Sequence, residues 1–153
     1  MVRVLFVCLG NICRSPMAEA VFRRKVRDAE LDDKIEVDSA GTGHWHVGET
    51  PHGGARRVLG AHGIQCNHRA RQVTVQDRDD FDYIVTMDEE NYADVGGLTG
   101  GRAAIARFLD FAPHLGTREV PDPYYTGGFE EVYRLLDEAA DGLLATIRAE
   151  HKL

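Results

Sequence analysis

The sequence has few of the features that mark secreted, membrane or nucleic-acid-binding proteins. Its 153 residues include only three cysteines, an odd number that does not suit a disulfide framework, and no apolar run long enough to cross a bilayer. The formal net charge of -7 argues against a nucleic-acid partner, because phosphate-backbone binding requires clustered Lys and Arg. The G-x-x-x-x-G-K-[ST] loop of nucleotide hydrolases is also absent. We therefore expect neither a membrane nor a nucleic acid as a partner.

The first residues do not have the pattern of a signal peptide. Asn11 and Arg14 interrupt the apolar run where a signal peptide needs hydrophobic continuity, so we interpret this segment as a buried strand of the mature protein. Free thiols without a secretion signal favour a reducing compartment, and we expect the cytoplasm. The length suits one hydrophobic core, so residues 1–153 are predicted to form one domain.

Short apolar runs alternate with longer helical patterns along the chain. The strands are expected at residues 2–7, 35–40, 83–87 and 106–109, and the helices at about residues 16–30, 53–63, 89–95 and 129–147. This alternation predicts an α/β fold with a four-stranded parallel sheet and helices on both faces, a Rossmann-like three-layer sandwich. Ligands bind beyond the carboxyl ends of strands in such folds, which is where the segment after the first strand must lie.

The segment from Cys8 to Arg14 combines a nucleophile, a cation and an expected helix start. Five residues separate Cys8 from Arg14, and Ser15 is predicted to cap a helix whose first turn includes Pro16. The backbone N–H groups of such a loop can form a nest for a tetrahedral oxyanion, and the helix dipole adds positive potential there. Gly10 would supply conformational freedom, and Asn11 tolerates a left-handed backbone.

The two ends of this loop supply the chemistry. Arg14 can bind two phosphate oxygens at once, and the cationic surroundings favour the thiolate form of Cys8. A thiolate beneath a bound phosphate is an in-line nucleophile. The alternative, a buried strand-end cysteine and an unrelated surface arginine, is disfavoured by the glycine, the Ser-Pro pair and the strand-loop-helix context.

A second segment supplies a candidate acid. Pro121 and Pro123 restrict the backbone on both sides of Asp122 and would aim its carboxyl group. Expulsion of a phenolate or an alkoxide requires a proton, which such a group can donate. A turn without a catalytic role remains the alternative for this segment.

These motifs together resemble the low-molecular-weight protein tyrosine phosphatase family over nearly the whole chain. The resemblance rests on V-C-L-G-N-I-C-R-S-P with Cys8 and Arg14, and on four later stretches: S-A-G-T from Ser39, H-R-A-R-Q from His68, M-D-E-E-N from Met87, and D-P-Y-Y from Asp122. A C-x-x-x-x-x-R loop at the N-terminus with the acid far downstream is characteristic of this family.

The resemblance implies a two-step hydrolysis of phosphotyrosine through a phosphocysteine intermediate, without a cofactor. Cys8 would be the nucleophile, Arg14 would bind phosphate, and Asp122 would act as general acid and then as general base. Leu9, Gly10, Asn11, Ile12, Cys13 and Ser15 would complete the phosphate-binding loop, with Ser39 and His68 supporting it. Trp45, Tyr124 and Tyr125 match or adjoin the walls of the substrate cleft, although core or surface packing remains an alternative, and for Tyr125 neither reading is preferred.

The remaining histidines and cysteines carry weaker signals. His44 and His46 lack a third metal ligand, so we expect no metal site. The family suggests a reversible disulfide between Cys13 and Cys8 that protects the nucleophile, although Cys13 also suits simple packing. Cys66 has no role in this scheme.

Three other functions compete with a phosphotyrosine phosphatase. An arsenate reductase on this fold needs a later cysteine pair, and no cysteine follows Cys66. A protein-arginine phosphatase of this family has threonine where Ile12 stands here. A non-catalytic phosphotyrosine-binding module would be expected to lack Cys8 or Asp122. We therefore expect tyrosine-phosphorylated proteins as substrates and a monomeric enzyme.

Overall fold

The protein is built around a parallel sheet of four strands. The computed structural model describes residues 1–98 and 100–153. The strand order is β2-β1-β3-β4, with all neighbours parallel. The strands are β1 (Val2–Cys8), β2 (Ile35–Gly41), β3 (Tyr83–Thr86) and β4 (Ala104–Arg107). The register pairs Cys8 with Gly41, so the last residue of β1 lies beside the end of β2.

The prediction for the last strand was wrong in position. Pairing with β3 uses residues Ala104–Arg107, while Phe108 and Leu109 begin the 3-10 helix η1 (Phe108–Phe111). Both side chains are buried in the core under helix packing. Their apolar character, which suggested a strand, therefore reflects burial in a turn of helix.

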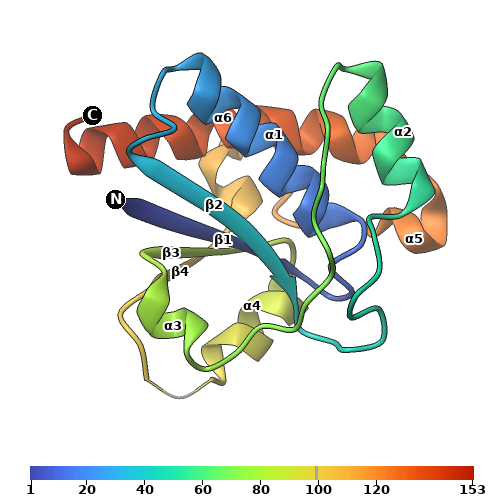
Figure 1. Cartoon of the computed structure of the whole chain (residues 1–153), viewed down its shortest axis with the longest axis horizontal. Coiled ribbons are helices and arrows are strands. Elements are labelled where there is room, and N and C mark those ends of the chain that lie inside the picture. The colour runs from blue at the N-terminus through green and yellow to red at the C-terminus, as the bar shows by residue number, and fades with distance from the viewer. Residues whose placement is uncertain (99) are drawn as a thin grey trace.

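Helices cover both faces of the sheet, as the alternating pattern predicted (Figure 1). One face packs against α1 (Arg14–Asp28), α2 (Gly53–Ala61) and α6 (Phe129–His151), and the other against α3 (Asp77–Asp80) and α4 (Glu89–Gly96). Two short elements, η2 (Pro113–Leu115) and α5 (Pro123–Thr126), lie between η1 and α6. The helices of four residues or fewer, α3, η1, η2 and α5, were not predicted, because one turn is too short to show a helical period.

Alternation along β1 divides the core into two layers. Val4 and Phe6 face α1 and α6, while Leu5 and Val7 face the α3 and α4 side. The Phe6 ring lies 5.6 Å from that of Phe22 in an edge-on arrangement. Full burial of each such side chain contributes about 1.5–3 kcal/mol to folding. A central strand of a parallel sheet is covered on both faces, which explains why β1 is apolar throughout.

The first helix begins earlier than predicted. Arg14 is its first residue, Cys13 is the N-cap, and no side chain caps the helix. The prediction that Ser15 is the cap was therefore wrong, because Ser15 already lies in the first turn. Pro16 is in that turn as expected, where its missing N–H leaves no hydrogen bond unmade.

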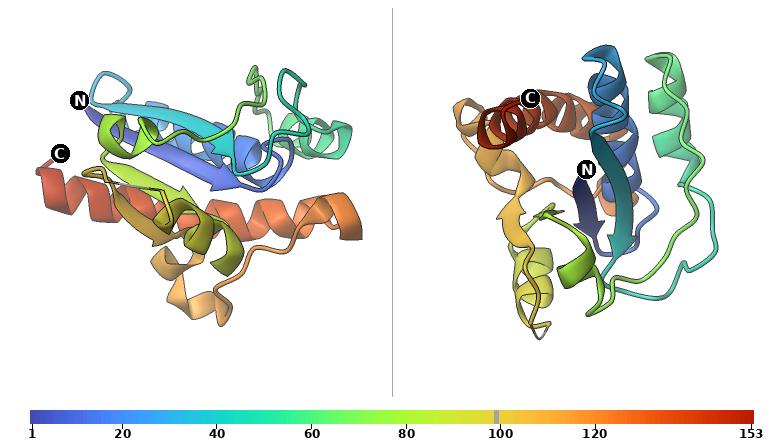
Figure 2. Two further views of the ribbon diagram at one scale, coloured as in Figure 1. Left: turned by 90° about the horizontal axis from the view of Figure 1, so that it is seen from below. Right: turned by 60° about the vertical axis from the view of Figure 1, so that its left-hand side comes forward.

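The carboxyl ends of β1 and β2 point toward the loops that precede α1 and α5, whereas both chain termini lie toward the opposite end (Figures 1 and 2). Among the helices of residues 1–98 and 100–153, none combines the length and the apolar character needed to span a membrane.

The long helix α6 approaches η1 closely at Gly142. A Cβ atom at this position would lie 1.9 Å from the carbonyl oxygen of Phe111, closer than any real contact. Gly142 is in the middle of a helix, where glycine is unfavourable. Its lack of a side chain lets η1 pack directly against α6. This contact anchors η1, which leads into the segment that carries Asp122.

Gly142→Ala should lower the free energy of unfolding by about 1–3 kcal/mol, because the added methyl overpacks the α6–η1 contact. Gly60→Ala on α2 is the matched control, since nothing lies within 4 Å of a Cβ there. The control should be neutral or stabilising by up to about 1 kcal/mol. Chemical denaturation measures both values. Equal stability of the two variants would contradict the close approach.

Candidate active site

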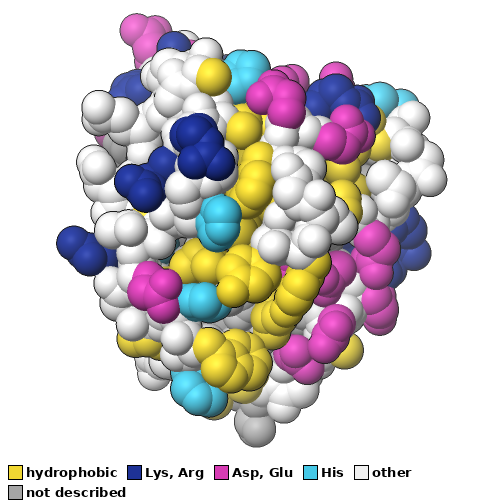
Figure 3. Space-filling model, turned by 90° about the vertical axis from the view of Figure 1, so that its right-hand side faces the viewer, with side chains coloured by type: hydrophobic (Ala, Val, Ile, Leu, Met, Phe, Trp, Pro, Cys, Tyr) yellow, Lys and Arg dark blue, Asp and Glu magenta, His cyan; other side chains and the backbone are white. Residues whose placement is uncertain are grey.

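A cleft of about 370 Å³ opens at the end of β1, with the loop after Cys8 as its floor. Figure 3 views this end of the molecule and shows hydrophobic side chains and histidines gathered near its centre, with acidic side chains beside them. The cleft is lined by Cys8, Leu9, Gly10, Ile12, Cys13, Arg14, Trp45, His46, Asp122, Tyr124 and Tyr125. Cys8, Arg14 and Asp122, which the sequence singled out from distant segments, thus meet in one cleft.

The backbone of the loop directs its carbonyl groups outward. The carbonyls of Cys8, Leu9 and Ile12 accept hydrogen bonds from the N–H groups of Thr42, Gly43 and His52, at 2.9, 2.9 and 2.7 Å. Within the part of the chain that the structure describes, the loop N–H groups of Leu9, Gly10, Ile12, Cys13 and Arg14 find no acceptor. Buried N–H groups are rarely left unpaired, so this loop has the geometry of an anion-binding nest.

Two residues shape the loop. Asn11 has φ +58°, which confirms the predicted left-handed backbone. Gly10 does not have a positive φ, so the conformational freedom predicted for it is not needed for a left-handed backbone. The absence of a side chain at Gly10 instead leaves space for His46, whose Cδ2 would lie 3.1 Å from a Cβ atom.

The buried side chain of Asn11 connects the loop to its surroundings. Its amide nitrogen donates to Ser15 Oγ at 2.8 Å and to Ser39 Oγ at 3.0 Å. Its amide oxygen accepts from the backbone N–H of Arg71 at 3.0 Å and faces His68 Nε2 at 2.7 Å. Ser39 and His68, which the family resemblance gave as supports of the loop, are therefore joined to it directly through Asn11.

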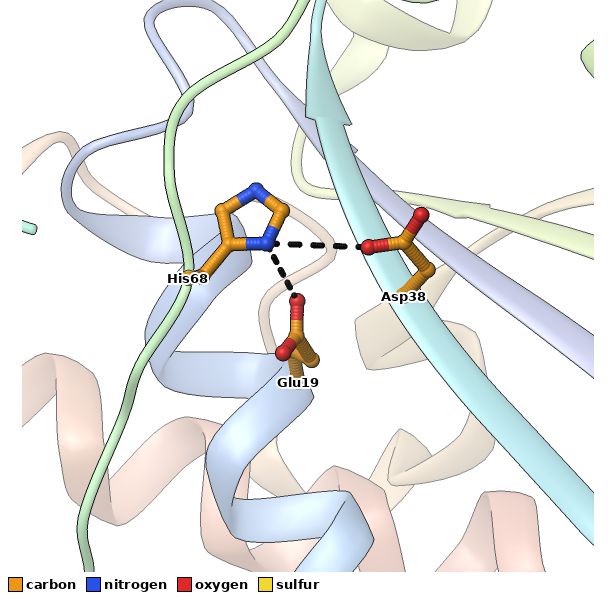
Figure 4. A group of neighbouring side chains, drawn as sticks. All are labelled: Glu19, Asp38 and His68. Carbon is orange, nitrogen blue, oxygen red and sulfur yellow. Dashed lines mark ion pairs between the residues drawn. The ribbon is translucent and has the colours of Figure 1, made fainter. Parts of the chain in front are cut away.

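His68 lies between this network and two carboxylates (Figure 4). Its Nδ1 is 3.2 Å from Glu19 and 3.6 Å from Asp38. Because the Arg71 N–H fixes the oxygen of Asn11 as an acceptor, His68 Nε2 must donate to it. Both ring nitrogens of His68 thus lie close to possible acceptors, Nε2 to Asn11 and Nδ1 to Glu19.

The same three side chains are the one group among the described residues with metal-ligand spacing, since their ligand atoms lie within 4.8 Å of one another. Their hydrogen bonds already have other uses. Glu19 accepts from Ser39 Oγ at 2.7 Å, and Asp38 pairs with Arg71 at 3.1 Å. The carboxylates of Glu19 and Asp38 are therefore already paired with Ser39 and Arg71, and the group forms a polar network.

The sulfur of Cys8 receives hydrogen-bonding groups from the loop and the helix. Asn11 N–H donates to Sγ at 3.3 Å, and Ser15 Oγ lies 3.0 Å from it. The thiol of Cys13 has a pKa raised to about 12, because it is buried and lies near Cys8 and Asp122. Burial also raises the pKa of Cys66. The environment therefore keeps the two other thiols protonated at neutral pH.

Arg14 joins the loop to two acidic residues from other elements. Its Nη1 donates to Asp88 at 2.6 Å and to the carbonyl of Val120 at 3.0 Å, and its Nη2 lies 3.4 Å from Asp122. Burial opposes the charge, but the neighbouring Cys8, Asp88 and Asp122 raise the pKa of Arg14 above its ordinary value. The guanidinium stays charged and is held by its neighbours at the cleft.

Aromatic side chains form the mouth of the cleft. Trp45 is 65% exposed and stacks on His44, with ring centroids 5.4 Å apart. Tyr124 contacts His46 and His52, each with ring centroids 5.9 Å away. Tyr125 lines the cleft although it is 75% exposed. All three predicted wall residues thus line the same opening.

The comparisons with known proteins agree with this geometry. Residues 3–153 match the family model described as low molecular weight phosphotyrosine protein phosphatase. The chain belongs to this family. The low molecular weight protein-tyrosine-phosphatase YfkJ of Bacillus subtilis is 49% identical over 156 residues, covering 100% of both chains.

Solved structures of the low-molecular-weight phosphatase family share the fold closely. The crystal structure of YfkJ has a TM-score of 0.95 at 50% identity and covers 98% of this chain and 96% of that one. A protein tyrosine phosphatase of Entamoeba histolytica has a TM-score of 0.92 at 38% identity and covers 100% of both. A Drosophila arginine phosphatase has a TM-score of 0.89 at 33% identity, with 95% and 97% covered.

Sequence reasoning missed three residues of this phosphatase site. Asp88, the partner of Arg14, was quoted only within the M-D-E-E-N stretch, although its place directly after a buried strand was a usable signal. Glu19 is buried on a helix, where an acidic side chain needs partners. His46 was considered only as a metal ligand, but it lines the cleft and pairs with Glu49 at 3.0 Å.

Asn11→Gly should lower the free energy of unfolding by about 1–3 kcal/mol, because His68 and the Arg71 N–H lose a buried acceptor. Asn11→Ala should cost about 1–2 kcal/mol more, since alanine also resists the left-handed backbone. Denaturation of the three proteins measures both steps. An Asn11→Gly variant as stable as the wild type would show that the side-chain network contributes nothing.

Proposed function

We propose that this protein-tyrosine-phosphatase hydrolyses phosphotyrosine monoesters through a phosphocysteine, with the residues in the following roles. The Cys8 thiolate attacks phosphorus, forming the S–P bond as the bond to the phenolic oxygen breaks. Asp122 gives its proton to that oxygen. Water then attacks phosphorus while Asp122 accepts a proton, and the S–P bond breaks to release inorganic phosphate and the Cys8 thiolate.

The observation that carries this proposal is the position of Cys8 below unpaired N–H groups. The loop carbonyls are paired elsewhere, the unpaired loop N–H groups are available to an anion, and Arg14 lines the same cleft. Such donors stabilise the charge that develops on the equatorial phosphoryl oxygens in the transition state. Each group comes from this chain, and we propose that the reaction needs neither a metal nor a cofactor.

The shape of the cleft supports phosphotyrosine as the substrate. Trp45 and Tyr124 border its mouth, and Ile12, which is almost fully buried, gives its floor an apolar surface. A phenyl ring packs well between such side chains, and its length carries the phosphate to the loop. A serine side chain is too short to do so.

The alternatives have less support. The Drosophila relative is named an arginine phosphatase, so the fold itself does not distinguish the two substrates. Ile12 offers no hydroxyl to a guanidinium, which favours tyrosine here. An arsenate reductase relay lacks its thiols, because Cys8, Cys13 and Cys66 are the only cysteines. A non-catalytic module would not need the acid and the nucleophile in one cleft.

We further propose that residues 1–153 act as one domain and as a monomer in the cytoplasm, on tyrosine-phosphorylated proteins. The three free thiols support a reducing compartment. Cys13 lines the same cleft as Cys8, and this supports the reversible disulfide between them that the family resemblance implies.

Cys8→Ser should abolish turnover of a small aryl phosphate, because serine is not ionised at neutral pH. Binding of inorganic phosphate should persist, since the nest and Arg14 remain. Phosphate should therefore still raise the Tm of the variant, as ligand binding to the folded state requires. Turnover at the wild-type rate would remove the covalent mechanism.

Asp122→Asn removes the ionisable carboxyl group and keeps the local structure. The asparagine side chain can still accept the hydrogen bond that Tyr124 N–H donates to Asp122 at 3.0 Å. The loss of a general acid should lower kcat/KM by about 10²–10⁴ for leaving groups of high pKa. The loss should be much smaller for p-nitrophenyl phosphate, whose leaving group needs little protonation. Equal losses for both substrates would assign Asp122 a structural role.

Ile12→Thr should narrow the preference for phosphotyrosine over phosphoarginine, because a hydroxyl replaces an apolar contact at the floor of the cleft. The wild type should cleave phosphotyrosine peptides far better than phosphoarginine or phosphoserine peptides. Ile12→Val, which keeps the apolar branched shape, is the control. The measurement is kcat/KM for the three peptides. A wild-type preference for phosphoarginine would overturn the substrate assignment.

A further inference from the structure

A second hollow of about 400 Å³ lies beside the catalytic cleft. We call it the flanking hollow, and it is lined by Leu9, Thr42, Gly43, Trp45, Gln72, Val73, Glu90, Asp94 and Leu98. Leu9 and Trp45 also line the catalytic cleft, so the two spaces share a wall. A peptide bound with its phosphotyrosine in the cleft would therefore bring a neighbouring residue to the flanking hollow.

The charged residues of the flanking hollow are both acidic. Glu90 and Asp94 stand one turn apart on α4, and within residues 1–98 and 100–153 neither has a cation within salt-bridge distance. The two acidic residues just before them do have cationic partners, since Asp88 pairs with Arg14 and Glu89 with Arg107. The nearby Arg78 donates to the carbonyl of Leu98 at the rim.

The stability of α4 itself accounts for Glu90 but not for Asp94. Glu90 is in the first turn, where a negative side chain is favoured by the helix dipole. Asp94 lies beyond that turn, and two like charges four residues apart on a helix repel each other. The pair is therefore unfavourable in the free protein and becomes favourable when a cation is placed between the two carboxylates.

The other walls suit the stem of a long side chain. Trp45 presents an exposed ring, and Val73 and Leu98 add apolar surface. Lys and Arg pack their aliphatic stems on such surfaces while the charged end stays near water, and a cation also binds an indole face.

We infer that the flanking hollow is a subsite for a Lys or Arg side chain one or two residues away from the phosphotyrosine of a substrate protein. This inference rests on the function proposed above. One residue of extended chain spans about 3.3–3.6 Å, so one or two residues suffice to pass the single side chain of Trp45. The subsite makes basic flanking residues a determinant of substrate choice.

The test is a scan of phosphotyrosine peptides in which Lys, Ala or Glu occupies each of the two positions on either side of the phosphotyrosine. At one position, kcat/KM should be about two- to fivefold higher for Lys than for Ala, the range expected for exposed ion pairs, and lower for Glu than for Ala. Glu90→Gln with Asp94→Asn should remove this preference and leave p-nitrophenyl phosphate turnover unchanged, because that substrate has no flanking residue.

The matched control is Asp32→Asn with Asp33→Asn. These two exposed residues precede β2, at the end of that strand opposite to Thr42 and Gly43 of the flanking hollow, and their replacement removes the same charge. The control should keep the Lys preference. Equal cleavage of all flanking residues by the wild type, or a preference that survives in the α4 double variant or is lost in the control, would overturn the subsite. Failure of the proposed chemistry would differ, since p-nitrophenyl phosphate would then not be hydrolysed through Cys8.

Discussion

The left-handed conformation of Asn11 and the four hydrogen bonds of its amide are the constraint on which the site depends. The turn at Asn11 directs its own N–H to Cys8, while the amide fixes α1 through Ser15 and β2 through Ser39. The same amide holds the segment after α2 through His68 and Arg71. Asparagine is suited to this position, because it tolerates the left-handed region and can both donate and accept in a buried site.

Arg14 forms a second connection, between the loop and Asp122. Arg14 begins α1 directly after the loop, and its guanidinium reaches Asp88 after β3 and both Val120 and Asp122. The buried cation thus connects the anion nest to the segment that carries Asp122. Charge-assisted contacts of this kind are directional, so binding of a phosphate at Arg14 and placement of the acid are coupled through one side chain.

Much of this arrangement was predictable from local patterns. The Cys8–Arg14 spacing and the alternation of strands and helices indicated the cleft and the sheet, because both depend on short stretches of sequence. The family resemblance added Ser39 and His68, which local reasoning alone did not single out. The pairing of Asp88 with Arg14 was missed, because only the folded chain shows which cation the residue after β3 meets. The true start of α1 was missed because no side chain caps it. Leu109 shows the same limit, since an apolar run buried in a 3-10 turn resembles a strand.

The central claim is that the loop holds Cys8 as the group that accepts the phosphoryl. The most direct measurement is rapid acid quench of the enzyme during turnover of a phosphotyrosine peptide, followed by mass spectrometry of the digested protein. A single phosphate on Cys8 is predicted, with none on Cys13 or Cys66 and none in Cys8→Ser. A phosphate on any other residue, or turnover without a phosphoenzyme that persists in Cys8→Ser, would contradict the account.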